Sequence, residues 1–456
     1  MTSSIVHGQY PQRRPNGLWR GTSAMVMGLT GTLSKTFLYG LNDLEVFGLD
    51  NFMQILESRR DPSQRQRGLI TARLLISHFF LTSLDDPLIW GVLPLRYTFE
   101  PWNLRWGLGA HDICFKNKAL GTFFTLGQVL PIHRNMHSPH AGLFQPSMTQ
   151  AVRLLSAYPF KTTGEHLADA GPDQPRTLTT QSLLQDLRDP FSGGSLTYTT
   201  TGRDVHTAPS AFLSNRFAWV HAFPEGLVHQ HPDRQMRYFK WGVARLVLEA
   251  EPMPDLVPMF VDGTADVMDE NRTWPRFLPR PGKKIRVAFG DKVDMEATFG
   301  DLRRRWKALV REAMDAREAE IAAADNSRQQ AEAAMAAAAT APRAPRVVPD
   351  AGRTGIVVAA AASAARPPPP PSSSARKLDV LRVGELPEGL KHSKEAEEIR
   401  VEVAFRVRNE VLKLRRSLGY PEEDPAWGFG RAETWAKDPK DTKRSPVDGS
   451  VEKPSL

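Results

Sequence analysis

A histidine and two aspartates in an apolar stretch are the first residues of the chain that could do chemistry. Six residues separate His78 from Asp85, and Asp86 follows directly. A histidine can act as a general base near neutral pH, and a carboxylate beside it can fix its tautomer and stabilise its charged form. This set predicts activation of a hydroxyl group for attack. The alternative is a histidine that makes only structural hydrogen bonds.

The tetrad Phe223-Pro224-Glu225-Gly226 is the second candidate, and it ends an apolar run. The proline restricts the backbone at the turn, and the glycine lets a substrate approach the main chain. The carboxylate of Glu225 could then accept hydrogen bonds from a glycerol hydroxyl. The alternative is a simple turn that ends a strand.

The elements that must position these residues indicate an α/β fold. Residues 68–99 mix β-branched and aromatic side chains around an Asp-Asp-Pro turn, which predicts buried strands and a short helix. Apolar clusters also cover 105–134 and 216–261, where AWVHAFPEG and LVPMFVDG each read as a strand that ends in a turn. With a helix expected over Met236–Glu249, strands and helices alternate. We therefore predict one catalytic domain at residues 43–310, with a central mixed sheet flanked by helices.

The first 42 residues read as a basic segment for a membrane surface. No acidic residue precedes Asp43, and four basic residues are present: Arg13, Arg14, Arg20 and Lys35. This bias resembles that of mitochondrial targeting segments. Residues 24–41 are apolar, but glycines, a serine and a lysine interrupt them, so they fall short of the roughly 20 apolar residues of a spanning helix. We expect this stretch to lie on a bilayer. An amphipathic helix packed on the core is the alternative.

The remaining segments are read from their composition. Residues 157–209 are rich in Ser, Thr, Gly, Asp and Pro, which predicts a surface insertion. A charged helix is expected from Asp301 to about Ala324. The division at residues 311–376 contains the rest of this helix and then a disordered Ala- and Pro-rich linker. In the extension 377–456, apolar side chains share one face of a helix over Ser393–Leu418. We expect that helix to dock on the domain, with a second membrane-surface helix as the alternative.

The charge balance favours an anionic partner. The formal net charge is +8 and the sequence pI is about 9.5, which suits nucleic acid or an acidic lipid surface. Without a nucleic-acid motif or interleaved aromatic and basic residues, we expect an anionic phospholipid membrane and no nucleic acid. The single cysteine, Cys114, excludes an intrachain disulfide and a cysteine-rich zinc motif. We expect neither a metal nor another cofactor.

Several motifs follow one another in an order that resembles the glycerophospholipid acyltransferase superfamily. They are the histidine with its aspartate, Arg134 at the end of GQVLPIHR, the FPEG tetrad and Val257-Pro258. Three further stretches, LDDPLIWG, RWGLGAHDICF and WVHAFPEG continuing to MRYFKWGVARL, make the chain similar to the tafazzin family. The similarity covers most of residues 17–310, and fungal-type members best match the tail helix.

The resemblance implies an α/β acyltransferase domain whose histidine activates a lysophospholipid hydroxyl for attack on an acyl ester. Acyl chains would pass between phospholipids without coenzyme A, which remodels cardiolipin at mitochondrial membranes facing the intermembrane space. The implied roles are Asp85 orienting the base, Arg134 holding phosphate, Phe223, Pro224, Glu225 and Gly226 shaping the glycerol site, and Pro258 lining it. The superfamily's usual arginine just after FPEG is absent here, and Arg237 or Lys240 could supply that charge.

The segment around His78 departs from the family pattern. The family has Asn before this histidine and four residues before the aspartate, whereas this chain has Ser77 and six residues. Two extra residues would turn the imidazole away from Asp85 unless the backbone bulges. Family-like sequence resumes at Leu84, as though residues 72–83 had been replaced, which a misread exon boundary would produce. The alternatives are therefore a lipid-binding acyltransferase fold with impaired catalysis, and a phospholipase-like hydrolase that uses water as acceptor.

Overall fold

The computed structural model describes residues 17–73, 85–135, 137–157, 197–212, 214–226, 235–267, 278–340 and 384–435. His78 lies outside these ranges, as do Arg13 and Arg14, residues 158–196 of the expected insertion and residues 341–376 of the expected linker. Asp85 is described only as the first backbone residue of a helix.

Five strands form a mixed sheet in the order β1-β9-β8-β2-β7. β2 pairs in parallel with both β7 and β8, β1 pairs in parallel with β9, and only the β8–β9 pair is antiparallel. Central strands buried on both faces need continuous apolar runs, and β7 and β8 have them, as predicted. The strands are β1 (Asp43–Phe47), β2 (Leu69–Arg73), β7 (Trp219–Ala222), β8 (Asp255–Asp262) and β9 (Lys284–Phe289).

A parallel pair, β3 (Gly107–Ala110) and β4 (Val129–Ile132), continues this sheet beyond β7. Trp106 forms a parallel bridge with Val220. The backbone N–H of Trp106 donates to Trp219 O at 2.7 Å, and its backbone carbonyl accepts from His221 N at 2.8 Å. The strands β8, β2, β7, β3 and β4 therefore all end at one edge of the combined sheet.

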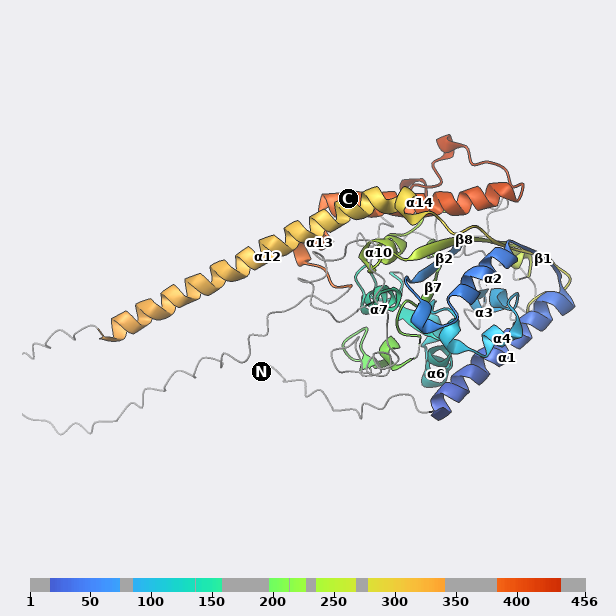
Figure 1. Cartoon of the computed structure of the whole chain (residues 1–456), viewed down its shortest axis with the longest axis horizontal. Coiled ribbons are helices and arrows are strands. Elements are labelled where there is room, and N and C mark those ends of the chain that lie inside the picture. The colour runs from blue at the N-terminus through green and yellow to red at the C-terminus, as the bar shows by residue number, and fades with distance from the viewer. Residues whose placement is uncertain are drawn as a thin grey trace, which may run out of the picture.

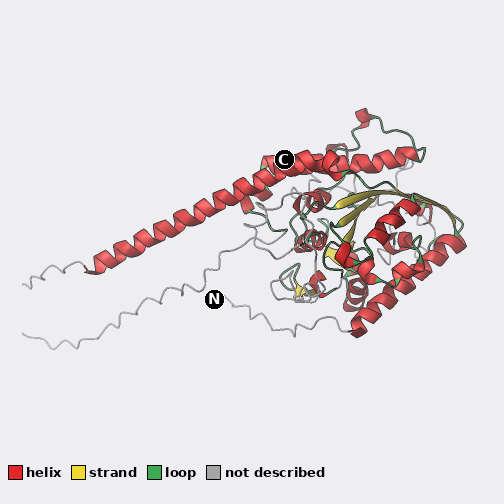
Figure 2. Cartoon of the chain, viewed as in Figure 1, coloured by secondary structure: helices red, strands yellow, loops and turns green. Residues whose placement is uncertain are grey.

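Helices cover both faces, giving three layers (Figures 1 and 2). Side chains alternate along β8: Val257 and Met259 join the core under α1 to α4, and Leu256 and Phe260 join the core under α7, α10, α12 and α14. Helices α5 and α6 lie outside these two groups, whereas α11 contributes to both cores and α13 to the core under α10. The α-helices are α1 (Gly17–Leu41), α2 (Leu49–Ser58), α3 (Asp85–Trp90), α4 (Leu95–Thr98), α5 (His111–Cys114), α6 (Lys118–Leu126), α7 (Pro146–Leu155), α10 (Gly242–Glu249), α11 (Thr264–Val267), α12 (Met295–Thr340), α13 (Glu388–Lys391) and α14 (Lys394–Ser417). The predicted α/β class and central mixed sheet are confirmed.

Small residues allow one face of α1 to lie close against the domain. A Cβ at Gly28 would come within 2.1 Å of the Phe99 ring, and one at Gly31 within 2.4 Å of Thr98. Met27 and Leu38 of the same face are buried in the core. The other face exposes large apolar side chains, which are Leu18, Met25, Leu29, Leu33, Tyr39 and Leu41. In the described part of the chain, α1 and every other helix are too short or too polar to cross a membrane.

α14 docks on the domain, as predicted. Ser393 caps its first turn by accepting from Ala396 N, and Gly419, with φ of 82°, follows its last turn. The apolar stripe is buried against α10, α12 and β8, its members being Ile399, Val403, Val407 and Val411. Arg406 also pairs with Asp301 at 2.7 Å, which joins α14 to the start of α12.

Two predicted helix bounds are wrong. Residues 236–241 are not helical and α10 begins only at Gly242, because backbone N–H groups of this stretch serve the FPEG turn instead. The charged helix begins at Met295 and runs to Thr340 rather than ending near Ala324. Alanine has the highest helix propensity and needs no burial, so the Ala-rich segment continues α12 away from the domain (Figure 1).

Candidate active site

The edge where the parallel strands end gathers most of the predicted site. Arg73 ends β2, the FPEG turn follows β7, and His133-Arg134 follow β4. The segment that contains His78 leaves β2 at this same edge and returns to the described chain at α3. Ligands of α/β sheets usually bind beyond the carboxyl ends of the strands, so the topology itself marks this edge as the candidate site.

The FPEG turn is tightly held. Gly226 has φ of 58°, a conformation that suits glycine, and its N–H donates to Phe223 O at 3.0 Å. Glu225 is 1% exposed, and its Oε1 accepts from Arg237 N at 2.7 Å. Lys240 N donates to Pro224 O at 2.7 Å, and the Lys240 side chain packs directly over Gly226. Glu225 and Lys240 therefore lie in one small assembly.

Arg237 contacts the turn through its backbone, whereas its side chain points elsewhere. The residue is 1% exposed, and its guanidinium lies 4.5 Å from the centre of the Trp435 ring. Its carbonyl accepts from Arg408 Nε of α14 at 2.8 Å. The sequence proposed Arg237 and Lys240 as equal sources of positive charge, but only Lys240 has its side chain beside Gly226.

Aromatic residues support the turn from inside the sheet. His221 is fully buried on β7, and its ring meets those of Trp90 at 5.0 Å and Phe223 at 4.6 Å. Its Nδ1 lies 2.7 Å from Thr71 Oγ1, which also accepts from Trp219 Nε1. His221 was not among the residues predicted from the sequence. Its place two residues before Phe223, on the same face of the strand, was the available signal.

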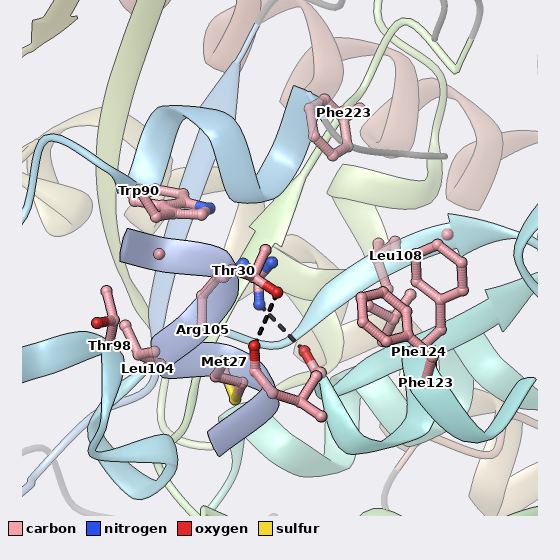
Figure 3. A pocket seen from close by; sticks show the side chains of 15 residues that line it. Met27, Thr30, Trp90, Thr98, Leu104, Arg105, Leu108, Phe123, Phe124 and Phe223 are labelled. Atoms are coloured by element: carbon pink, nitrogen blue, oxygen red, sulfur yellow. Dashed lines mark hydrogen bonds between the residues drawn. The ribbon is translucent and has the colours of Figure 1, made fainter. Parts of the chain in front are cut away.

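An apolar pocket opens beside the turn, between α1, β3, α6 and Phe223 (Figure 3). The rings of Trp90, Phe123, Phe124 and Phe223 line it, with Met27 and Thr30 of α1 at its side. Among the described residues of the lining, Arg105 is the one charged side chain, and it donates to Gly127 O at 3.2 Å. Such a pocket suits a hydrocarbon chain.

Arg134, the predicted phosphate ligand, forms a two-point ion pair with Asp112 of α5. Its Nε donates to Asp112 Oδ1 at 3.0 Å, and a second guanidinium nitrogen contacts Oδ2. Burial favours the neutral form of Asp112, but the hydrogen bond and charge of Arg134 outweigh it and hold the pKa of Asp112 below its usual value. Both side chains are partly exposed, so a phosphate could compete with Asp112 for the arginine.

Pro258, predicted to line the glycerol site, is buried within β8. It pairs with Ala72, packs against Gly290, and is separated by β2 from the strand that carries FPEG. Ala72 and Arg73, the first residues of the atypical segment 72–83, continue β2 in register with β8. The guanidinium of Arg73 is buried and lies 5.3 Å from the centre of the Phe223 ring.

A group of imidazoles that the sequence analysis missed lies next to Arg134. His111 and His133 stack with ring centres 4.3 Å apart, and the hairpin of β5 (Thr197–Tyr198) and β6 (His206–Thr207) brings Asp204 against them. Burial lowers the pKa of His111, and burial together with the charge of His111 lowers that of His133 to about 4. Burial opposes the charge of Asp204, but hydrogen bonds from Thr200 and other groups of the hairpin hold its pKa well below the usual value.

Comparison with known proteins gives relatives along most of this domain. The chain is 34% identical over 314 residues to tafazzin of Saccharomyces cerevisiae, which covers 67% of this chain and 71% of the yeast protein. It is 24% identical over 293 residues to tafazzin of Drosophila melanogaster, covering 64% of this chain and 57% of the fly protein. It is 26% identical over 282 residues to the N-acylphosphatidylethanolamine synthase of Arabidopsis thaliana, covering 61% and 72%. No family model matches the chain.

Proposed function

Because the chain belongs to the tafazzin family and is a phospholipid acyltransferase, we propose that it is a transacylase that works without coenzyme A. It moves acyl chains from a phospholipid to a lysophospholipid and thereby remodels cardiolipin. The apolar pocket whose wall includes Phe223 of the FPEG turn is the observation that best supports this proposal. An acyl chain in the pocket would bring its ester to the turn and to the edge where β2 ends.

The proposed reaction uses a histidine as general base. His78 removes the proton of the lysophospholipid hydroxyl while the hydroxyl oxygen attacks the ester carbonyl carbon of the donor. The C–O bond of the donor ester then breaks, the acyl group stays on the acceptor, and His78 returns the proton to the departing glycerol oxygen. Asp85 would orient the imidazole, since α3 begins at this residue directly after the segment that contains His78.

The proposed lipid contacts divide between the glycerol and the phosphate. Glu225 and Gly226 would hold the glycerol part, and Lys240, whose side chain lies over Gly226, would supply positive charge. Arg134 would bind a phosphate in place of Asp112, because its fork already presents two donors to two oxygens. Pro258 would act through the packing of β8, since β2 lies between it and the turn.

The proposed location is a mitochondrial membrane facing the intermembrane space, with the chain held on one side of the bilayer. The exposed apolar face of α1 supports a membrane surface as partner, and Phe123 of the pocket wall is also 37% exposed. A lipid could therefore pass from a bilayer at α1 into the pocket with little exposure of its chain to water.

The test is an assay in which a transacylase, a hydrolase and a catalytically impaired acyltransferase fold give different results. Purified chain is incubated with phosphatidylcholine labelled in its acyl chain and with monolysocardiolipin, with and without coenzyme A. We expect labelled cardiolipin in equal amounts under both conditions. Labelled free fatty acid would indicate the hydrolase, and neither product, with lipid binding retained, would indicate an acyltransferase fold impaired by its His–Asp spacing.

A further inference from the structure

We propose that His111, His133 and Asp204 bind a divalent transition-metal ion of the zinc class. Because the chain lacks a cysteine-rich motif, we expected no metal site from its sequence. The proposed acyl transfer does not use these three residues, so the metal site and the proposed function are tested independently.

Strand register brings the two histidines together. Ala110 and Ile132 are the last paired residues of β3 and β4, so the next residues, His111 and His133, leave the same edge side by side. Asp204 arrives from the β5–β6 hairpin, which is distant in sequence from both. A metal ion here would join three separate segments of the chain.

The geometry is close to that of a bound ion. The candidate ligand atoms of the three residues all lie within 4.8 Å of one another, and His111 Nε2 is 4.0 Å from Asp204 Oδ2. Zinc bonds of roughly 2.0–2.2 Å in tetrahedral geometry put ligand atoms about 3.4 Å apart. Contraction by up to about 1.4 Å would bring the three ligand atoms to bonding distance of one ion, and His111 is partly exposed, which leaves its ring room to move.

The chemistry of the residues also fits. Two imidazoles and a carboxylate are a common zinc ligand set. His133 is 4% exposed, and its Nε2 lies 2.7 Å from Thr200 Oγ1. Its Nδ1 has no hydrogen-bonding partner among the residues that the structure describes, which leaves this nitrogen available as a ligand atom. Asp204 is held by His206 at 2.9 Å and by Thr200, and such outer partners orient the ligands of metal sites.

Titration of the full chain with metal tests the proposal. The protein is purified with a tag that contains no histidine, stripped with a chelator, and titrated with Zn²⁺ against a competing chelator, and bound zinc is counted by mass spectrometry. We expect one zinc per chain. His111→Ala and His133→Ala should each weaken binding by more than the roughly 10–100-fold that loss of an outer partner costs. His137→Ala is the matched control, since His137 is exposed in the same loop as His133.

Two further measurements keep a folding defect from deciding the result. Circular dichroism of the stripped variants must match that of the stripped wild type, and His111→Ala is the safer variant because its ring is partly exposed. Hydrogen exchange of residues 197–207 should slow on zinc addition in wild type and in His137→Ala, but not in His111→Ala. Absence of stoichiometric zinc, or equal affinity in wild type and both folded histidine variants, would overturn the proposal and leave a hydrogen-bonded cluster.

Discussion

The carboxylate of Glu225 is anchored at Oε1 by the backbone N–H of Arg237. This buried carboxylate therefore holds the FPEG turn in place, and the proposed contact with a substrate hydroxyl would come in addition. The two readings of the tetrad, a substrate-binding turn and a structural turn, need not exclude each other. Isosteric and truncating substitutions separate the two contributions.

We expect Glu225→Gln to lower transfer by roughly 10²-fold with little loss of stability, because its amide oxygen can still accept from Arg237 N. Glu225→Ala should lower transfer similarly and also cost about 1–3 kcal/mol, since it leaves a buried N–H without its acceptor. Transfer rates and thermal unfolding of both variants provide the measurement. A Gln variant with wild-type transfer would restrict Glu225 to holding the turn.

The second prediction for individual residues concerns His78. If His78 is the base, His78→Ala should reduce transfer by the roughly 10²–10⁴-fold typical of losing a general base, with stability little changed. The chain should then be compared with a version in which residues 72–83 carry Asn-His and four residues before Asp85. The first two residues of the replacement must still form the end of β2, since Ala72 and Arg73 pair with β8.

Robust transfer by both versions would mean that the altered spacing is harmless. Transfer by the restored version alone would mean that His78 does not act as the base in this sequence, which would then describe an inactive acyltransferase fold.

At the scale of elements, α1 has two faces with different tasks. Its small residues and Met27 pack on the domain and line the pocket, so deletion of the helix would damage the fold as well as any membrane contact. Substitutions on the exposed face test the membrane contact alone.

We expect Leu29→Glu with Leu33→Glu to reduce liposome binding at least 10-fold, because each leucine, 54% and 72% exposed, would otherwise bury apolar surface worth up to about 1.5–3 kcal/mol. Flotation with cardiolipin-containing liposomes measures this. Ile321→Glu with Met335→Glu, two exposed positions on α12, is the control and should bind like wild type. Equal binding by the α1 variant would place the membrane contact on another surface.

α14 supports the candidate site from the far end of the sequence. Arg408 pairs with the buried Glu423 at 2.7 Å and donates to the carbonyl groups of Met236 and Arg237, next to the N–H that anchors Glu225. The helix therefore fixes the backbone on which the FPEG turn depends.

We expect Arg408→Ala to lower the free energy of unfolding by about 3–5 kcal/mol, because it leaves the buried carboxylate of Glu423 without its partner. Lys413→Ala, an exposed change on the same helix, should stay within about 0.5 kcal/mol of wild type. Chemical denaturation of both variants is the measurement. A loss no larger in Arg408→Ala than in Lys413→Ala would show that this ion pair does not hold the extension to the domain.

For the molecule as a whole, the apolar surface of α1 on an otherwise folded domain predicts attachment to one side of a bilayer. Isolated mitochondria treated with carbonate should retain the protein partly, and protease should reach it from one side only. Cleavage at different segments from both sides of the membrane would contradict this arrangement.

The sequence predicted the elements whose pattern is local. Apolar runs and a following turn identified β7 and β8, and the stripe from Ile399 to Val411 identified α14 and its docking. Residues 236–241 could not be assigned correctly, because their helical pattern is overridden by hydrogen bonds to the FPEG turn. The cluster of His111, His133 and Asp204 depends on strand register and on a distant hairpin, so no local spacing indicated it.

Because α14 lies far along the sequence, one sheet face remains partly uncovered until late in translation. The sheet face that α14 covers is complete in sequence at Phe289, but its cover, including Val403, Val407 and Leu412, is translated only after the long segment that follows α12. At about 5–20 residues per second, the ribosome needs roughly 6–25 s to translate from Phe289 to Leu412. During this time a nascent chain carries an apolar sheet surface with part of its cover missing. A chaperone that shields such a surface would therefore have most to do late in translation, when nearly the whole domain already exists.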